Sequence, residues 1–594
     1  MIGSHRTLTQ RPESNAGDMR NQIDFALPPE KLFLNPARDA GLSLLRPAEY
    51  FWRPAEPALI AGFAASAHDA MNERIRSFLT LTRRHKTFDQ VIEFNTVPVL
   101  LEDAAFRKSY VLARGQCVLN GASGIRLLNR YRWEHEEDSQ HPDDRLMAYF
   151  QSCQVQNAEV GIPLWGKPLP EGIDHAIECR NTFNYFHFMT ESLCQLALLA
   201  EEEIRGNVYF HFPNAPEKHR AFASGFVDAL FPELAGRVFF ERAPREYGVV
   251  VGALSLMCLY YQFPASMIGN VDEYAPSNVM WKGQDATRVS QSILSMNSIS
   301  SSLRLLRERA LRAIEGQDFS HLPKRFYVGR DANQSRARRM KGENALFGML
   351  QPFGFDYIVF EHLSPLEQIA IMANAEMMIS YHGAGFTNML FANPESYVIE
   401  LGTLQTAAYR WQDFWPLAHV SGCRYVSFFA DHHKDDPMED PQFAEEGIIP
   451  VHLTDKALGQ VMAFVVTLLG NIPQLSHAAD VLALVRELLG VRAWRRAAEV
   501  LDLHANLVRD NLELCLAKAD CHKAQEQLKS ELYALHRAWE ANRNRWQTLV
   551  RMVWAARRAG MPEVAAWALA LLRQDFPARY DALVSAQPWM RQLA

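Results

Sequence analysis

Residues 379–401 read ISYHGAGFTNMLFANPESYVIEL, and the prediction of the fold starts from this stretch. An apolar strand is followed by a glycine loop, a short helix, a turn and a second strand that ends with Glu400. This order is typical of a parallel sheet, whose ligands bind at the carboxyl ends of the strands. Gly383 and Gly385 let backbone N–H groups approach an anion, and the following helix directs its positive end there. We therefore expect a pocket that suits a nucleotide diphosphate.

The candidate donors of this pocket lie in the loop and in the first turn of the helix: His382, Gly383, Ala384, Gly385, Thr387 and Asn388. His382 stands where the strand ends, so it either donates to a phosphate oxygen or caps the turn. Glu400, at the end of the next strand, is placed to accept hydrogen bonds from ribose hydroxyls. A tight turn whose glycines serve only steric needs is the alternative interpretation of the loop.

A group of arginines follows the strand predicted at 325–328. Arg330 stands at the tip of that strand, and the loop after it contains further arginines, among them Arg338 and Arg339. A guanidinium group can donate two parallel hydrogen bonds to a phosphate. We predict that Arg330 binds the diphosphate, helped by Arg338 or Arg339. A solvated basic loop is the alternative.

The segment from Asn184 to Glu191 reads NYFHFMTE and opens an otherwise apolar helix predicted at 186–204. His187 and Glu191 are four residues apart and therefore share one face of that helix. We predict that the pair faces a cleft between two domains, where it deprotonates the hydroxyl group of an acceptor. Asn184 and Tyr185 are placed on the same acceptor side. A buried pair with a structural role is the alternative.

The chain of 594 residues is long enough for several domains. Strands and helices alternate over 86–315 and again over 316–474, which predicts an α/β fold with two Rossmann-type domains facing a cleft. Residues 1–85 are an N-terminal extension with a helix at 61–82. Residues 475–594 are predicted to be an α-helical domain with the character of a helical repeat. Two long helices are also expected, at 290–314 and 507–536.

Composition excludes some classes of partner. Lys and Arg total 61 and Asp and Glu total 68, so the formal net charge of −7 gives no reason to expect nucleic acid. The eight cysteines lack paired spacing, which indicates isolated thiols in a reducing compartment. No apolar signal core begins the sequence, and the longest apolar run, at 461–469, is far below the ~20 residues of a membrane span. We expect a cytoplasmic protein, with a peripheral position at the inner face of the membrane as an option.

Taken together, these motifs resemble glycosyltransferase family 61. The Asn-Tyr-Phe-His…Glu motif, Arg330 with its arginine loop, and His-Gly-Ala-Gly-Phe-Thr-Asn occur in the family's order within about 90–470. The resemblance is most specific over 325–402. Phe188-Met189 and Phe386 depart from the commoner residues of the family, which bears on the choice of donor or acceptor.

The resemblance implies a GT-B-like fold and an inverting transfer of a sugar from a nucleotide-sugar donor, usually a UDP-sugar. The acceptor would be a glycan or another hydroxyl compound, and bacterial members of the family are linked to capsule or surface polysaccharide. We expect neither cofactor nor metal, because the sequence has no Asp-x-Asp and its arginines can stand in for a divalent ion. His187 is the first choice as general base and Glu191 its orienting partner, although Glu191 itself is an alternative base.

Three other classes compete with this interpretation. A non-catalytic nucleotide- or carbohydrate-binding scaffold would act through the helical domain, which could also dimerise the chain or bind a polysaccharide-assembly complex. An α/β-hydrolase needs a G-x-S-x-G elbow, and the stretch from Gly121 to Gly124 lacks that spacing. A dinucleotide oxidoreductase needs a G-x-G-x-x-G motif after an early strand, which is missing.

Overall fold

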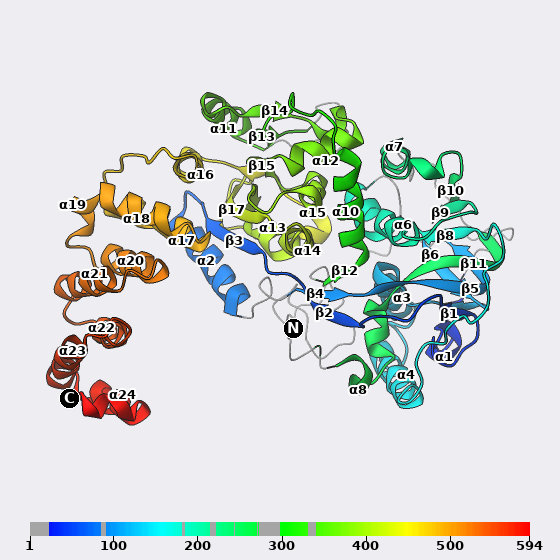
Figure 1. The fold of residues 1–594 in the computed structure, drawn as a ribbon, viewed down its shortest axis with the longest axis horizontal. Coiled ribbons are helices and arrows are strands. Elements are labelled where there is room, and N and C mark those ends of the chain that lie inside the picture. Colours follow the sequence, from blue (N-terminus) through cyan, green and yellow to red (C-terminus); the bar gives the residue numbers. More distant parts are fainter. Residues whose placement is uncertain are drawn as a thin grey trace.

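The computed structural model describes residues 23–84, 91–180, 184–213, 221–242, 244–269, 271, 298–330 and 340–593. Two large sheets lie beside each other, and a run of helices extends away from them toward the C-terminus (Figure 1). This confirms a mixed α/β fold with Rossmann-like parallel sheets and a helical region at 455–592.

One of the two large sheets, named here the C-terminal sheet, is built from parallel strands in the order β14-β13-β15-β16-β17. Its strands are β13 (Arg325–Val328), β14 (Asp356–Ile358), β15 (Met377–Tyr381), β16 (Tyr397–Thr403) and β17 (Arg424–His432). The chain moves outward from β13 to β14 and then returns to the other side of β13 with β15. The strand order therefore reverses between β13 and β15, and such a switch point is where open α/β sheets bind ligands.

Helices complete the crossovers of this sheet. They are α11 (Glu343–Leu350), α12 (Pro365–Ala373), the 3₁₀ helix η9 (Ala384–Phe391), α13 (Leu404–Tyr409) and α14 (Trp415–Ser421). Every residue of β15 is buried, as expected for a strand covered on both faces. The glycine stretch of the sequence thus forms the predicted strand, loop, short helix and second strand.

The N-terminal sheet has the order β10-β9-β8-β11-β5-β6-β7. Its parallel strands are β8 (His175–Glu178), β9 (Val208–Phe212), β10 (Val238–Arg242) and β11 (Arg245–Ser255). The antiparallel strands are β5 (Thr96–Arg107), β6 (Tyr110–Ala113) and β7 (Gln116–Cys117). Because β9 and β10 lie on one side of β8 and β11 lies on the other, this sheet also has a switch point, between β8 and β11.

The residues before 85 contribute to both sheets. β1 (Leu42–Leu44) pairs with β5, whereas β3 (Leu59–Ala64) adds a parallel strand beside β17. The helix predicted at 61–82 is therefore wrong at its start, since α2 (Asp69–Arg84) begins only after β3. A third, small sheet has the order β12-β4-β2. Its strands are β2 (Trp52–Pro54), β4 (Ile92–Phe94) and β12 (Ser298–Ser300).

The helix predicted at 290–314 is also corrected by the structure. β12 occupies 298–300, and α10 (Ser302–Ile314) follows it, so the prediction is wrong at 298–300 and correct from Ser302 onward. Residues 290–297 lie outside the described residues. α10 contacts α6 (Cys194–Leu199) of one unit and α12 and η9 of the other. It therefore lies at the junction of the two α/β units (Figure 1).

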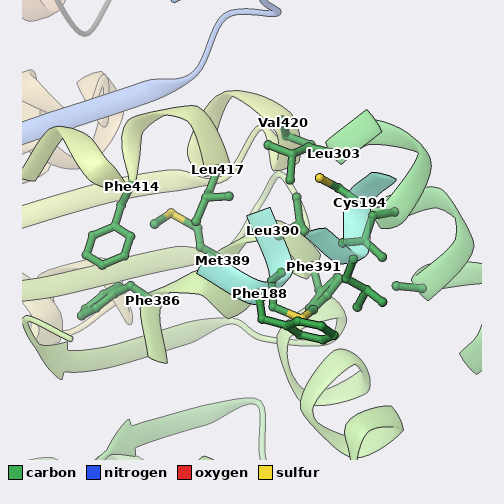
Figure 2. Close-up of a cluster of buried hydrophobic side chains, with 14 of the residues drawn as sticks. Phe188, Cys194, Leu303, Phe386, Met389, Leu390, Phe391, Phe414, Leu417 and Val420 are labelled. Atoms are coloured by element: carbon green, nitrogen blue, oxygen red, sulfur yellow. The ribbon is translucent and has the colours of Figure 1, made fainter. Parts of the chain in front are cut away.

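One hydrophobic cluster continues from the N-terminal unit into the C-terminal unit (Figure 2). Phe188 and Met189 belong to it from one side, and Phe386, Met389 and Phe391 belong to it from η9. All five are at most 1% exposed. Burying such a side chain contributes roughly 1.5–3 kcal/mol. The two units are therefore held in a fixed relation by a shared core.

The C-terminal helices pack against one another in sequence and, through a second hydrophobic cluster, against the C-terminal sheet. They include α16 (Asp455–Leu468), α17 (Ala478–Gly490), α18 (Trp494–Leu503), α20 (Leu512–Ala524), α21 (Leu528–Ala541), α22 (Trp546–Arg558), α23 (Pro562–Asp575) and α24 (Pro577–Ala586). The long helix predicted at 507–536 is wrong. Asn511 caps α20, and Glu526 adopts a positive φ of 58° between α20 and α21. None of the helices in the described part of the chain combines the length and the hydropathy that a membrane span requires.

Glu487 on α17 gives this region a predicted pH dependence. Burial raises the pKa of Glu487 from 4.5 to about 8, against the hydrogen bond that Gln460 donates to it. The folded chain then keeps a proton that the unfolded chain releases near pH 4.5, so stability falls as pH rises from about 4.5 through 8. Between pH 6 and pH 9 this effect lowers the stability of the wild type by about 3 kcal/mol, and we expect Glu487→Gln to lack this loss.

Urea unfolding at the two pH values measures this effect. Glu563→Gln, at an exposed position on α23, is the matched control and should keep the wild-type pH dependence. An equal loss of stability in Glu487→Gln and wild type would show that Glu487 is ionised at no cost in the fold.

Candidate functional site

Arg330 and the glycine loop meet at the switch point of the C-terminal sheet. Arg330 Nη2 donates to the carbonyl oxygen of His382 at 2.7 Å, and the guanidinium lies 4.8 Å from the centre of the Tyr381 ring. A Cβ atom at Gly383 would lie 2.3 Å from Arg330 Nη2. Glycine at this position therefore permits Arg330 to close over the loop. Arg338 and Arg339 lie outside the described residues.

The backbone of the loop remains accessible beside Arg330. Ala384 is exposed, and Gly383 and Gly385 are half-buried. A Cβ atom at Gly385 would lie 3.3 Å from the Phe360 ring, so glycine also relieves crowding on the inner side of the loop. The loop thus combines a cation with accessible backbone at the carboxyl edge of a parallel sheet, which is an arrangement that suits an anion.

Glu400 lies beneath the loop and not at its surface. Its side chain is fully buried, and Oε1 is hydrogen-bonded to Nδ1 of His382. Its other oxygen accepts hydrogen bonds from the hydroxyl groups of Tyr425 and Ser427. The carboxylate predicted to bind ribose therefore has both oxygens engaged inside the protein. Its contacts are those of a group that orients the imidazole of His382.

Thr387 and Asn388 are also buried rather than exposed to a ligand. Asn388 Nδ2 donates to Gln368 Oε1 at 3.2 Å, and Asn388 Oδ1 accepts from the Tyr185 hydroxyl at 2.5 Å. Tyr185 belongs to the N-terminal unit. Asn388, predicted as a donor to the ligand, thus connects the two units in this structure.

The predicted His–Glu pair lies at the switch point of the N-terminal sheet. His187 Nδ1 is 2.7 Å from Glu191 Oε1, and Asn184 caps the backbone N–H of His187. The helix predicted at 186–204 is divided into α5 (Tyr185–His187), a π-helix η2 (Phe188–Leu193) and α6. π-helical turns are rare and occur frequently at functional sites.

Two arginines that the sequence analysis missed contact the same carboxylate. Arg126 Nη1, on α3 (Gly121–Glu134), lies 3.2 Å from Glu191 Oε2, and Arg180 Nη1 lies 3.9 Å from Glu191 Oε1. Burial alone would raise the pKa of Glu191. The hydrogen bond from His187 and the charges of His187, Arg126 and Arg180 instead hold that pKa at about 2. Arg180 follows a strand tip as Arg330 does, so the same signal could have found it.

The two switch points are adjacent. Besides the Tyr185–Asn388 hydrogen bond, a chain of aromatic rings connects them. The Phe186 ring lies 5.5 Å from the His187 ring and 5.9 Å from the Phe414 ring, centre to centre. The Phe414 ring in turn lies 5.3 Å from the ring of His382. Packed side chains therefore connect the histidine–glutamate pair of one sheet with the arginine–glycine loop of the other.

Both sites lie at switch points of strand order, which is where open α/β sheets generally bind ligands. Residues 185–399 match the Glycosyltransferase 61 family, so the chain contains a glycosyltransferase 61 domain. The matched range covers His187, Glu191, Arg330 and the glycine loop. No curated protein matches the chain. A domain of this family implies the transfer of a sugar from a donor to an acceptor.

Within the described residues, no group of three or more His, Cys, Asp or Glu side chains is placed to hold a metal ion. All eight cysteines are buried, and no disulfide joins any two of them, in agreement with the lack of paired spacing in the sequence.

Proposed function

We propose that the protein is an inverting glycosyltransferase with a GT-B-like arrangement, which moves a sugar from a nucleotide-diphosphate donor to a hydroxyl acceptor. The proposal assigns the acceptor to the N-terminal unit, 86–315, and the donor, with a UDP-sugar as first choice, to the C-terminal unit, 316–474. The observation that carries it is the contact between the two switch points within the family domain, at the Tyr185–Asn388 hydrogen bond.

The donor diphosphate is proposed to bind Arg330 and the backbone of the glycine loop. Arg330 carries a fixed positive charge and donates in a planar fork that matches phosphate oxygens. Glu400 occupies Nδ1 of His382, which leaves Nε2 as the ring nitrogen for a phosphate. Arg338 and Arg339 remain candidates for the same phosphates.

His187 is proposed as the general base of the single displacement that inversion requires. Glu191 binds Nδ1 of His187 and so leaves Nε2 for the proton of the acceptor hydroxyl. With its pKa held at about 2, Glu191 is a poor proton acceptor at neutral pH. The structure of the pair thus favours Glu191 as the orienting partner rather than as the base.

We propose that transfer does not need a divalent ion, because Arg330 and the loop supply positive potential at the leaving diphosphate. Turnover is expected to stay the same in EDTA. Loss of activity in EDTA and its recovery with Mn²⁺ would contradict this part of the proposal.

Gly383→Ala tests the donor site without removing any functional group. The new methyl group would displace the Arg330 guanidinium, which is the far end of a flexible side chain, so the fold should keep its stability. We expect UDP to bind about tenfold more weakly, since a charge-assisted hydrogen bond contributes about 1.5–3 kcal/mol. Calorimetry measures the affinity. Gly348→Ala, where an added Cβ meets nothing within 4 Å, is the control. An unchanged affinity for UDP in Gly383→Ala would place the diphosphate elsewhere.

The biological setting follows only from the family. We propose a role in bacterial surface polysaccharide or glycoconjugate synthesis, in the cytoplasm or at the inner face of the membrane. A non-catalytic scaffold that acts through the helical region is the alternative, favoured by an apolar groove of about 410 Å³ lined by Tyr533 and Trp567. Assays of donor hydrolysis and transfer with candidate acceptors separate the two, because a scaffold consumes no donor.

A further inference from the structure

The switch point of the N-terminal sheet carries more positive charge than the base requires. Arg126 and Arg180 share one carboxylate, Glu191, which also binds His187. The contact of Arg180 with Glu191, at 3.9 Å, is long for an ion pair. Without counting the imidazole, two guanidinium charges therefore face a single carboxylate charge.

Glu178, the other carboxyl group at this edge, does not balance the excess. It ends β8 and accepts a hydrogen bond from Ser123 at the start of α3. Burial raises the pKa of Glu178 from 4.5 to about 8, against that hydrogen bond and the charge of Arg126. The group is therefore mainly protonated and uncharged at neutral pH.

The described residues of the C-terminal unit add no counter-charge to Arg126 and Arg180 either. Arg410, which follows α13, forms an ion pair with Asp413 at 3.4 Å, so the charges of these two residues offset each other. Burial and the charges of Arg126 and Arg410 lower the pKa of Arg180, while Glu191 opposes the shift. Arg180 thus lies in a partly desolvated, positively charged environment, which is costly unless an anion is bound.

The two arginines are open to a ligand to different degrees. The Arg126 side chain is 19% exposed, and its Nε atom is buried without a hydrogen-bond partner among the described residues, so a ligand would approach Arg126 through its terminal nitrogens. The Arg180 side chain is 40% exposed, so a ligand can reach it. A carboxylate or phosphate group is the ligand that a guanidinium binds best, because its oxygens match the planar fork.

We propose that Arg126 and Arg180 bind an oxyanion of the acceptor, so that the protein transfers its sugar to an acidic glycan that carries a phosphate or a uronic-acid carboxylate near the reacting hydroxyl. This inference rests on the proposed function. The acceptor is the source because the two arginines contact the carboxylate that orients His187, whereas Arg330 and the glycine loop provide a separate place for the donor diphosphate.

Binding to the full chain tests the inference without an assay of transfer. Saturation-transfer NMR compares glucose 6-phosphate, glucuronate, glucose and UDP as probes. Wild type is expected to bind both acidic sugars at least about tenfold more tightly than glucose. Arg180→Gln should lose this preference and keep its affinity for UDP, and Arg180→Lys should retain part of it. Arg205→Gln, at a surface arginine of the same unit, is the control and should behave as wild type.

Two results would overturn the inference. One is equal binding of acidic and neutral sugars by the wild type. The other is an Arg180→Gln variant that weakens binding of UDP but not of the acidic sugars, because the arginines would then hold the donor diphosphate. If Arg180→Gln does not fold, as judged by thermal unfolding, Arg126→Gln replaces it. Failure of the proposed function would show in a different measurement, since wild type would then not bind UDP. The comparison of acidic with neutral sugars would still test the inference about Arg126 and Arg180.

Discussion

Replacing His187 with alanine is expected to lower turnover by about 10²–10⁴-fold, which is the usual cost of removing a well-placed general base. The acceptor hydroxyl then has to lose its proton to water. The affinity for UDP should stay within about twofold of wild type, because we propose that the donor binds at the other switch point, on Arg330 and the glycine loop. Steady-state kinetics and calorimetry measure the two quantities on the same preparations.

His321→Ala is the matched control for this substitution. The His321 side chain is 60% exposed and lies outside both switch points, so its loss should change neither turnover nor UDP affinity. Glu191→Gln should lower turnover as well, because it weakens the orientation of His187 and leaves Arg126 and Arg180 without their counter-charge. Turnover of His187→Ala within a few fold of wild type would remove His187 from the role of base.

Replacing Arg330 with alanine is expected to weaken UDP binding by about 10–100-fold. Each charge-assisted hydrogen bond contributes about 1.5–3 kcal/mol, and each 1.4 kcal/mol is about tenfold in affinity. The substitution also removes the hydrogen bond that holds the His382 carbonyl, so the loop loses part of its support. Turnover should fall too, since the leaving diphosphate develops charge in the transition state.

Arg325 offers a control at the other end of the same strand. It pairs with Glu376 at 2.8 Å, away from the carboxyl edge, so Arg325→Ala removes an equal charge from β13 without touching the site. Its affinity for UDP should equal that of wild type. If Arg330→Ala bound UDP as tightly as Arg325→Ala does, the assignment of the diphosphate to this edge would be wrong.

The sequence predicted correctly those parts of the fold that depend on patterns among residues close together in the chain. The strand, glycine loop, short helix and second strand at 379–401 follow from buried apolar runs separated by two glycines. The contact of His187 with Glu191 follows from the helical period. Strand β12 was missed because three residues give little signal. The break between α20 and α21 was missed because Glu526 adopts the left-handed conformation there. A glycine at that position would have indicated the break in the sequence.

The rest depends on contacts between distant residues. The sequence predicts Glu400 at the end of a strand and therefore beside a ribose. In the structure β16 continues to Thr403, and Tyr425 and Ser427 of the neighbouring strand enclose Glu400 together with His382. Arg126 reaches Glu191 from 65 residues away, and no periodic pattern marks it. The order of strands, which creates both switch points, is likewise set by packing of whole units and not by any single segment.

The anomeric configuration of the product tests the central claim most directly, because a single displacement with one base must invert it. Proton NMR of the transfer or hydrolysis reaction reports this configuration from the coupling of the anomeric proton as the donor is consumed. With a UDP-sugar that wild type accepts, we predict a first-formed product of inverted configuration, and we predict that His187→Ala forms it about 10²–10⁴-fold more slowly. A first-formed product of retained configuration, or equal rates in the two proteins, would contradict the account.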